Sequence, residues 1–181
     1  ARMGPHLNAY TGFDETVYMF QLQTDREGLV EKGIQALADF AGGITFDPKE
    51  VEKERGVVIE EWRGRLGAQQ RILDQQVPVL FHESKYAERL PVGKPEIVKT
   101  VPVERVRAFY ERWYRPDRMA VVIVGDVEPE KMLALVRTEF GALPKPATPP
   151  PPRDYPLPMH AETLLKVASD PEQQASTVSI M

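Results

Sequence analysis

The stretch "VEKERGVVIEEWRGR", residues 51 to 65, sets the predicted fold because its apolar residues recur at helical spacing. On a wheel of about 100° per residue, Val58 and Trp62 fall within about 20° of Val51. Asp47 and Pro48 supply a start signal just before this run. The pattern predicts an amphipathic helix that is buried on the face around Val51.

Two glutamates of this helix lie where apolar residues are expected. Glu54 and Glu61 fall about 60° and 80° from Val51, inside the predicted apolar arc, whereas Glu60 points to solvent. A carboxylate that faces a core is unfavourable unless it is paired, hydrogen-bonded or bound to a metal. Two interpretations follow from the helix alone: an ion pair, with Arg55 as the candidate partner, or a functional site.

The rest of the chain predicts a hairpin and further helices. Residues 7–13 and 16–22 are rich in β-branched and aromatic residues and flank a Gly12–Glu15 turn, which is typical of two paired strands. Apolar periodicity and capping signals predict the remaining elements: helices at 28–41, 102–114 and 129–140, a buried strand at 118–126, and strands at 163–169 and 175–181.

Several residues should set helix ends. Thr24 and Glu27 have the spacing of a capping box before the first helix. The helix that starts at Pro48 is expected to run through residues 51 to 65, to kink at Gly64 and Gly67, and to end at Pro78, before the irregular stretch that begins at Phe81.

Composition excludes several classes of site. The 181-residue chain has 42% hydrophobic and 28% charged residues, a formal net charge of -4 and no cysteine. The absence of a basic cluster argues against a nucleic-acid partner, and the absence of cysteine excludes disulfides and thiolate zinc sites. No apolar run approaches the length of a membrane helix.

The order of the motifs resembles a known family. "NAYTGFDETVY", "FDPKEVEKERGVVIEEW" and "RWYRPDRMAVVIVGDV" follow one another in the order seen in the inverzincin zinc peptidases of the pitrilysin and insulinase type, which include mitochondrial processing peptidase. The resemblance covers nearly the whole chain and is greatest to bacterial members. It implies an α+β fold with a mixed or antiparallel sheet and helices packed on one side.

The resemblance also implies roles for four residues. Glu61 matches the position of the third zinc ligand, and Glu54, about 10.5 Å away along the helix axis, matches an acid that orients a ligand histidine. Asn8 and Ala9 match an edge strand that takes up the substrate peptide through backbone hydrogen bonds. Tyr10 is expected on the opposite face of this strand from Ala9.

The chain departs from the family pattern in one respect. The family motif His-x-x-Glu-His, which supplies the general base and two zinc ligands, does not occur. The only histidines are His6, His82 and His160, and none receives a role. We expect the missing residues upstream of Ala1, in a longer protein, and we expect this chain alone to be inactive and not to retain zinc.

These inferences combine into one functional expectation. We expect residues 1–143 to be the C-terminal part of a peptidase domain, 144–158 a proline-rich linker and 159–181 the start of a second, similar domain. The full-length protein is expected to be a zinc endopeptidase for peptides or small unfolded proteins, which a second homologous half or subunit encloses. The alternative is a non-catalytic homologue that binds peptides or scaffolds a complex. An exported or periplasmic location is favoured over a cytoplasmic one.

Overall fold

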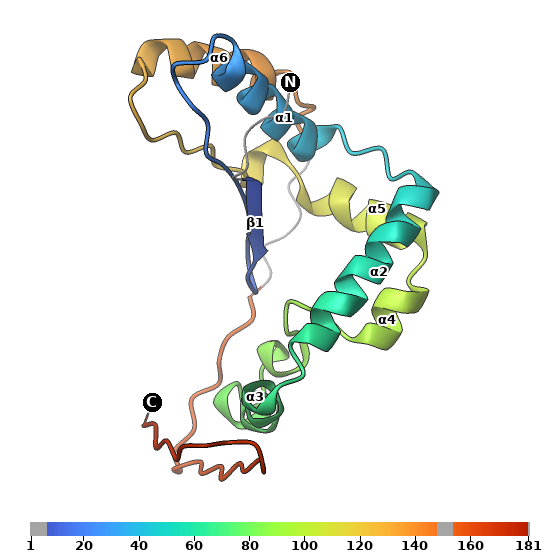
Figure 1. Ribbon diagram of the computed structural model, residues 1–181, viewed down its shortest axis with the longest axis vertical. Coiled ribbons are helices and arrows are strands. Elements are labelled where there is room, and N and C mark those ends of the chain that lie inside the picture. Colours follow the sequence, from blue (N-terminus) through green and yellow to red (C-terminus); the bar gives the residue numbers. More distant parts are fainter. Residues whose placement is uncertain (1–6, 148–153, 181) are drawn as a thin grey trace. The chain divides into compact units, whose positions relative to one another are not determined.

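The computed structural model describes residues 7–147 and 154–180, and the chain divides into two compact units. The first unit consists of Ala1–Pro48 and Pro102–Pro151, and the second consists of Lys49–Val101 and Pro152–Met181. Figure 1 labels the main helices and one of the strands. Each unit is described on its own below.

The first unit contains the predicted hairpin. Strand β1 (Leu7–Thr11) pairs antiparallel with β2 (Thr16–Phe20), so that Leu7 lies opposite Phe20 and Thr11 lies opposite Thr16. The Gly12 N–H donates to the carbonyl of Glu15 over 2.8 Å and closes the turn. The prediction of two strands around this turn is confirmed.

One face of β2 packs on helices. Tyr18 stacks on Phe40 of α1 (Leu29–Gly42), with ring centroids 5.1 Å apart, and its hydroxyl lies 2.8 Å from that of Tyr114, just after α5 (Val103–Trp113). Phe20 contacts the same Phe40 ring edge-on at 6.0 Å. The hydroxyl of Tyr110 in α5 donates to the carbonyl of Phe40 over 2.7 Å. Because alternate residues of a strand share a face, these contacts all lie on one side of the hairpin.

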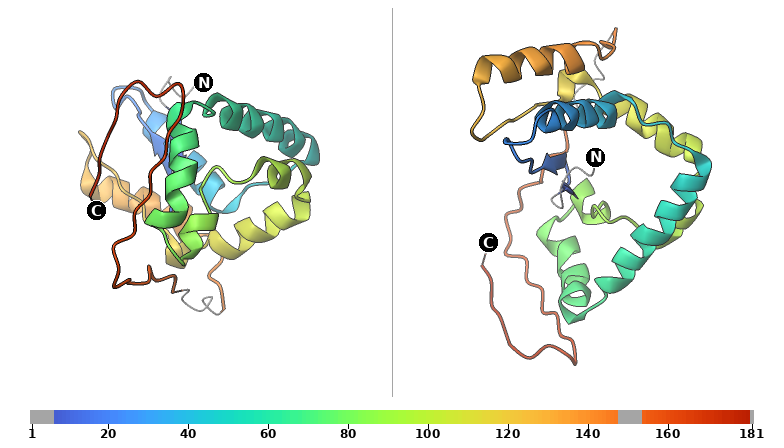
Figure 2. Two further views of the ribbon diagram at one scale, coloured as in Figure 1. Left: turned by 90° about the horizontal axis from the view of Figure 1, so that it is seen from below. Right: turned by 45° about the horizontal axis from the view of Figure 1, so that its top comes forward.

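Helix α1 also packs against α6 (Pro129–Gly141), as the views in Figures 1 and 2 show. The buried residues of the two helices are small or aliphatic: Leu29, Ile34, Ala38 and Ala41 of α1, and Met132 of α6. A Cβ at Gly33 of α1 would come within 2.2 Å of Cδ1 of Leu22, so a larger residue would require the end of this side chain to shift. An ion pair of 3.2 Å between Glu31 and Lys131 joins the same two helices at the surface.

The second unit is built from short helices around α2 (Pro48–Gly64). It also contains α3 (Ala68–Leu80), the 3₁₀ turn η1 (Lys85–Glu88) and α4 (Pro95–Thr100). The kink predicted at Gly64 and Gly67 is a complete break, which separates α2 from α3. Helix α3 ends at Leu80, before Phe81 as predicted, and Pro78 lies within its last turn.

Other predictions of local structure were wrong. Helix α1 begins at Leu29, and its N-cap is Gly28 in the left-handed region, so Thr24 and Glu27 form no capping box there. Within residues 7–147 and 154–180, β1 and β2 are the only strands, so 118–126, 163–169 and the described part of 175–181 are unpaired. Val122 and Val124, predicted to be buried, are 81% and 92% exposed. An apolar run adopts a strand only where another strand pairs with it.

The α+β class is confirmed, with an antiparallel sheet and helices packed on one of its faces. The short 3₁₀ turn η2 (Pro116–Arg118) completes the described elements of the first unit. Part of the expected linker, residues 148–153, falls outside the described residues, and the predicted domain boundaries stay a prediction. Among the described helices, none combines the length and the apolar character needed to cross a membrane.

Candidate functional site

Helix α2 buries only part of the predicted arc, on the side away from the two glutamates. Ile59 is buried and Arg55 is 12% exposed, whereas Glu54, Val57 and Glu61 are exposed. Arg55 and Ile59 lie at about +40° and +80° on the wheel that places Val51 at zero, so the packed face is shifted away from the two glutamates. The prediction that both carboxylates lie within a buried arc was therefore wrong.

The ion-pair interpretation of these glutamates also fails. Arg55 donates to the carbonyl oxygens of Val98 and Val101, at the C-terminal end of α4, where a cation is favourable to the helix dipole. Its carboxylate partner is Glu52, at 3.0 Å. Arg55 is thus occupied by other groups and does not neutralise Glu54 or Glu61.

Glu54 and Glu61 are free carboxylates on the same flank of α2. Within the described part of the chain, neither forms a hydrogen bond or an ion pair, whereas the neighbouring Glu60 pairs with Arg63 at 2.5 Å. Seven residues correspond to about 10.5 Å along the helix axis, too far for both to bind one metal ion directly. An exposed carboxylate without a partner at Glu61 fits the role of a single oxygen ligand for zinc.

The chain does not assemble a complete metal site from its described residues. No group of three or more histidine, aspartate or glutamate side chains with metal-binding geometry occurs among them. His82 lies 3.6 Å from Glu83, and His160 contacts the carbonyl of Glu162 at 2.5 Å. His6 falls outside the described residues. A catalytic zinc ion normally takes three protein ligands, and the described residues do not bring three together.

Strand β1 has an edge to which no other strand is bonded in the described structure. It pairs with β2 only, and all five of its residues are exposed. Directly opposed residues alternate between hydrogen-bonded and non-hydrogen-bonded pairs in an antiparallel ladder. Because Gly12 donates to Glu15, the pair of Ala9 and Tyr18, three positions further on, is of the second kind. The N–H and carbonyl of Ala9 therefore point away from β2, towards the free edge.

The Asn8 side chain occupies one of these outward groups. Its amide oxygen accepts the Ala9 N–H over 2.9 Å. Tyr10 lies on the opposite face of the strand from Ala9, as predicted, and its hydroxyl donates to Glu15 over 3.1 Å. That hydrogen bond raises the pKa of Tyr10. The sequence did not indicate this contact, since no pattern distinguishes a side chain that binds the backbone of the next residue from one that binds a ligand.

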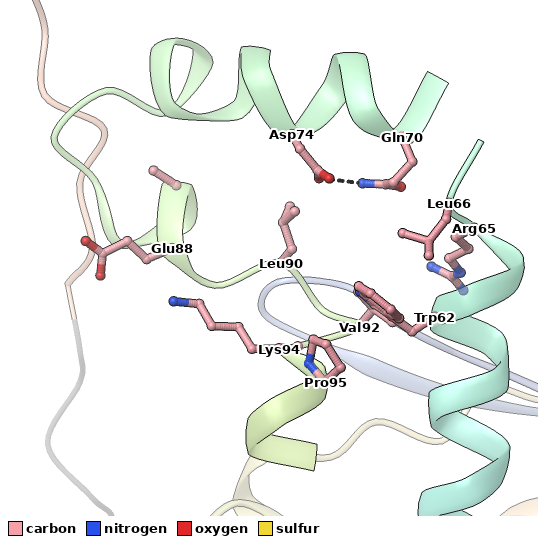
Figure 3. A pocket seen from close by; sticks show the side chains of 12 residues that line it. Trp62, Arg65, Leu66, Gln70, Asp74, Glu88, Leu90, Val92, Lys94 and Pro95 are labelled. Carbon is pink, nitrogen blue, oxygen red and sulfur yellow. Dashed lines mark hydrogen bonds between the residues drawn. The ribbon is translucent and has the colours of Figure 1, made fainter. Parts of the chain in front are cut away.

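The packed side of α2 borders a pocket of about 320 Å³ within the second unit. Figure 3 shows its lining side chains, among them Trp62 and Leu66 at the end of α2 and Leu90 before α4. Gln70 donates to Asp74 over 2.8 Å across one turn of α3. Trp62 follows Glu61 directly, but successive residues of a helix point about 100° apart. Neither Glu54 nor Glu61 is among the residues that line the pocket.

Comparisons with known proteins identify the family. Residues 1–91 match the model described as insulinase, peptidase family M16, and residues 100–181 match the model described as the peptidase M16 inactive domain. The chain is 38% identical over 181 residues to the zinc protease PQQL-like of Arabidopsis thaliana, covering 99% of this chain and 19% of that protein. It is 36% identical to the probable zinc protease PqqL of Escherichia coli, covering 79% of this chain and 15% of that protein.

Solved structures agree with the sequence matches. The first half of the periplasmic protease PqqL from Escherichia coli superposes with a TM-score of 0.80 at 34% identity, covering 87% of this chain and 33% of that one. The chain thus spans about a fifth or less of the curated relatives named above. Since these include a plant protein, the expected likeness to bacterial members in particular is not established. The two family models together with this structural match show that the chain belongs to the insulinase family of peptidases, family M16.

Proposed function

We propose that the full-length protein is a zinc-dependent endopeptidase for peptides or small unfolded proteins, in which this chain supplies one zinc ligand and the substrate-binding strand. The observation that carries the proposal is Glu61, a carboxylate that is exposed and unpaired within the described residues, at the position of the family's third ligand. Bound zinc supplies polarisation of the scissile carbonyl and of a water molecule. No residue of this chain is assigned as the general base.

Glu54 has a separate role in the proposal. It is exposed on the same flank as Glu61 and, like it, has no partner among the described residues. An acid two helical turns from a ligand is suited to accept the N–H of a ligand histidine and to fix its orientation. Glu61 would therefore bind the zinc ion directly, and Glu54 would act on it through the ligand histidine.

Strand β1 is proposed to hold the substrate. The outward N–H and carbonyl of Ala9 offer one donor and one acceptor to an extended peptide, which would add to the hairpin as a third strand. Binding of this kind relies on backbone groups and tolerates varied side chains. It suits substrates that are unfolded or have an extended segment, and it requires the Asn8 amide to release the Ala9 N–H.

A pair of neighbouring substitutions tests the ligand assignment in the full-length protein. Glu61→Gln keeps the size of the side chain but removes the anionic ligand, so we expect loss of bound zinc and of peptide hydrolysis. Glu60→Gln is the matched control, because Glu60 is the adjacent residue, is also a glutamate and is paired with Arg63 at the surface. Zinc content after dialysis and peptide cleavage are measured for both. Full zinc and activity in Glu61→Gln would refute the assignment.

One observation supports a second candidate function. The family model that matches residues 100–181 is described as an inactive domain, which is compatible with a non-catalytic homologue that binds peptides or scaffolds a complex. Zinc content of the full-length wild-type protein separates the two candidates. A zinc-free protein that still binds peptide would support the second.

The remaining proposals concern the whole protein. We propose an exported location, since the superposed Escherichia coli protease is described as periplasmic. We also propose that a second homologous half or subunit encloses the substrate, and that residues 144–158 link a peptidase domain, 1–143, to the start of a similar domain at 159–181. Limited proteolysis of the full-length protein, with cleavage expected first between residues 144 and 158, tests this division.

A further inference from the structure

Arg71, in the first turn of α3, makes an unusually large set of contacts with a distant segment of the chain. Its Nε and Nη2 donate to the two carboxylate oxygens of Asp170 over 2.6 and 2.8 Å. Nη2 also donates to Glu172 over 2.6 Å. We refer to these three residues as the Arg71 clasp. These contacts join two segments of the second unit, because Asp170 lies 99 residues after Arg71 in sequence.

The acidic side of the clasp is held in place. The Asp170 side chain is only 7% exposed. It accepts the Glu172 N–H over 3.0 Å, and the Gln173 N–H donates to the Asp170 carbonyl over 3.1 Å, which closes a turn. The Arg71 hydrogen bonds hold the pKa of Asp170 at about 2, well below its usual range. The acids are thus presented to Arg71 by a turn, and not by flexible side chains alone.

The start of α3 explains why acids are needed there. Its N-cap is Gly67, which offers no side-chain cap, and its first turn contains no acidic residue. A cation such as Arg71 in a first turn is unfavourable to the helix dipole, whereas nearby carboxylates are favourable. Asp170 and Glu172 therefore supply from another segment the negative charge that α3 lacks.

The same arginine also reaches the end of α2. Its Nη1 donates to the carbonyl of Leu66 over 2.8 Å, and Leu66 lies in the break between α2 and α3. Glu61 precedes Leu66 by five residues, or about one and a half helical turns. One guanidinium therefore fixes the break that follows the glutamate helix and binds the acidic turn at the same time.

We propose that Arg71 is a positioning residue, through which the turn at residues 170–172 fixes the end of α2 and hence the placement of Glu61. Arg71 lies in the part of the chain that matches the peptidase family model, and both acids lie in the part that matches the inactive-domain model. The clasp thus couples the two matched parts. The functional consequence rests on the proposed role of Glu61 as a zinc ligand.

The geometry requires arginine specifically. Three separate nitrogens of one planar group donate in different directions, to Asp170, to Glu172 and to Leu66. Lysine carries its charge on a single nitrogen and cannot match this fork. Arg71→Lys should therefore keep the positive charge but lose the hydrogen bonds that connect the acidic turn with Leu66, in the break between α2 and α3.

The test uses the full-length protein and two independent readouts. Hydrogen exchange reports on the break through the amides of Arg65, Leu66 and Gly67, which are bonded to Trp62, Arg63 and Arg65 at 3.1, 3.2 and 2.8 Å. The rise in unfolding midpoint on adding zinc ions reports on the metal site. The variants are Arg71→Gln, Arg71→Lys and Asp170→Asn. Arg63→Gln is the control, because Arg63 belongs to an exposed pair with Glu60 on α2.

We expect exchange at these amides to be about 10-fold faster in the three clasp variants, because charged hydrogen bonds that hold the break are lost. The zinc-induced rise in midpoint should shrink in them and stay unchanged in Arg63→Gln. If the Arg71 clasp only stabilised the fold, its loss would lower the unfolding midpoint equally with and without zinc, and this result would overturn the proposal. Unchanged hydrogen exchange at the three amides would also overturn it. If Glu61→Gln loses zinc while Arg71→Gln keeps the full zinc-induced rise in unfolding midpoint, the proposed role of Arg71 fails and the proposed function stands. If Glu61→Gln keeps zinc, the proposed function fails.

Discussion

Replacing Ala9 by proline tests whether β1 takes up substrate through its outer edge. The Ala9 N–H points away from β2, so proline removes a donor from the free edge without removing a hydrogen bond of the hairpin. A net hydrogen bond contributes about 0.5–1.5 kcal/mol, and about 1.4 kcal/mol corresponds to a tenfold change in affinity. We therefore expect roughly 2- to 10-fold weaker peptide binding. The lower part of this range is favoured because peptide binding also breaks the contact between Asn8 and Ala9.

The assay measures the Kd of a fluorescent unfolded peptide with the full-length protein after zinc removal, so that hydrolysis does not interfere. Tyr10→Pro provides the contrast, because the Tyr10 N–H faces Val17 in the hydrogen-bonded ladder, and its loss should disturb the hairpin itself. Zinc content of Ala9→Pro, measured separately, should equal that of the wild type. Unchanged peptide affinity in Ala9→Pro with an intact hairpin would refute the reasoning.

Further predictions concern the metal site and the Arg71 clasp. Glu54→Gln should weaken zinc binding by about 10- to 100-fold, as loss of a group that orients a ligand does, and competition with a chelating dye measures this. The 181-residue chain alone should show no chelator-sensitive peptide hydrolysis, since its described residues hold no set of three ligands. The depressed pKa of Asp170 means that its stabilising effect is present above its ordinary value near 3.8 and is lost as the pH falls through about 2. The difference in unfolding midpoint between wild type and Asp170→Asn should therefore persist at pH 5 to 7 and shrink below pH 4.

Local signals predicted those elements whose contacts are local. The Gly12–Glu15 turn and the flanking β-branched residues led to the correct hairpin, because pairing across a short turn needs only neighbouring residues. The same approach failed for residues 118–126, since an apolar run shows that a strand is possible but not which segment pairs with it. Val122 and Val124 are exposed for this reason.

In the candidate site, too, the features that the sequence did not predict depend on contacts between residues far apart in the chain. The helical wheel correctly placed Glu54 and Glu61 on one flank, but the direction in which α2 packs depends on Arg55, which binds carbonyls more than 40 residues away. Periodicity counts an arginine as polar and therefore does not show that the helix packs on the side of Arg55, away from the two glutamates. The role of Arg71 left no signal in the sequence, because its partners are 99 and 101 residues distant.

The contact between Asn8 and Ala9 has a consequence for the behaviour of the protein in solution. Unpaired strand edges promote aggregation, because any extended chain can add to them. An edge whose outward donor at Ala9 is covered by the preceding side chain presents fewer free groups to a chance neighbour. Asn8 would then act as a reversible shield, which a well-fitting peptide displaces and a poorly fitting one does not. Replacing Asn8 by alanine should make the full-length protein more prone to aggregate at high concentration.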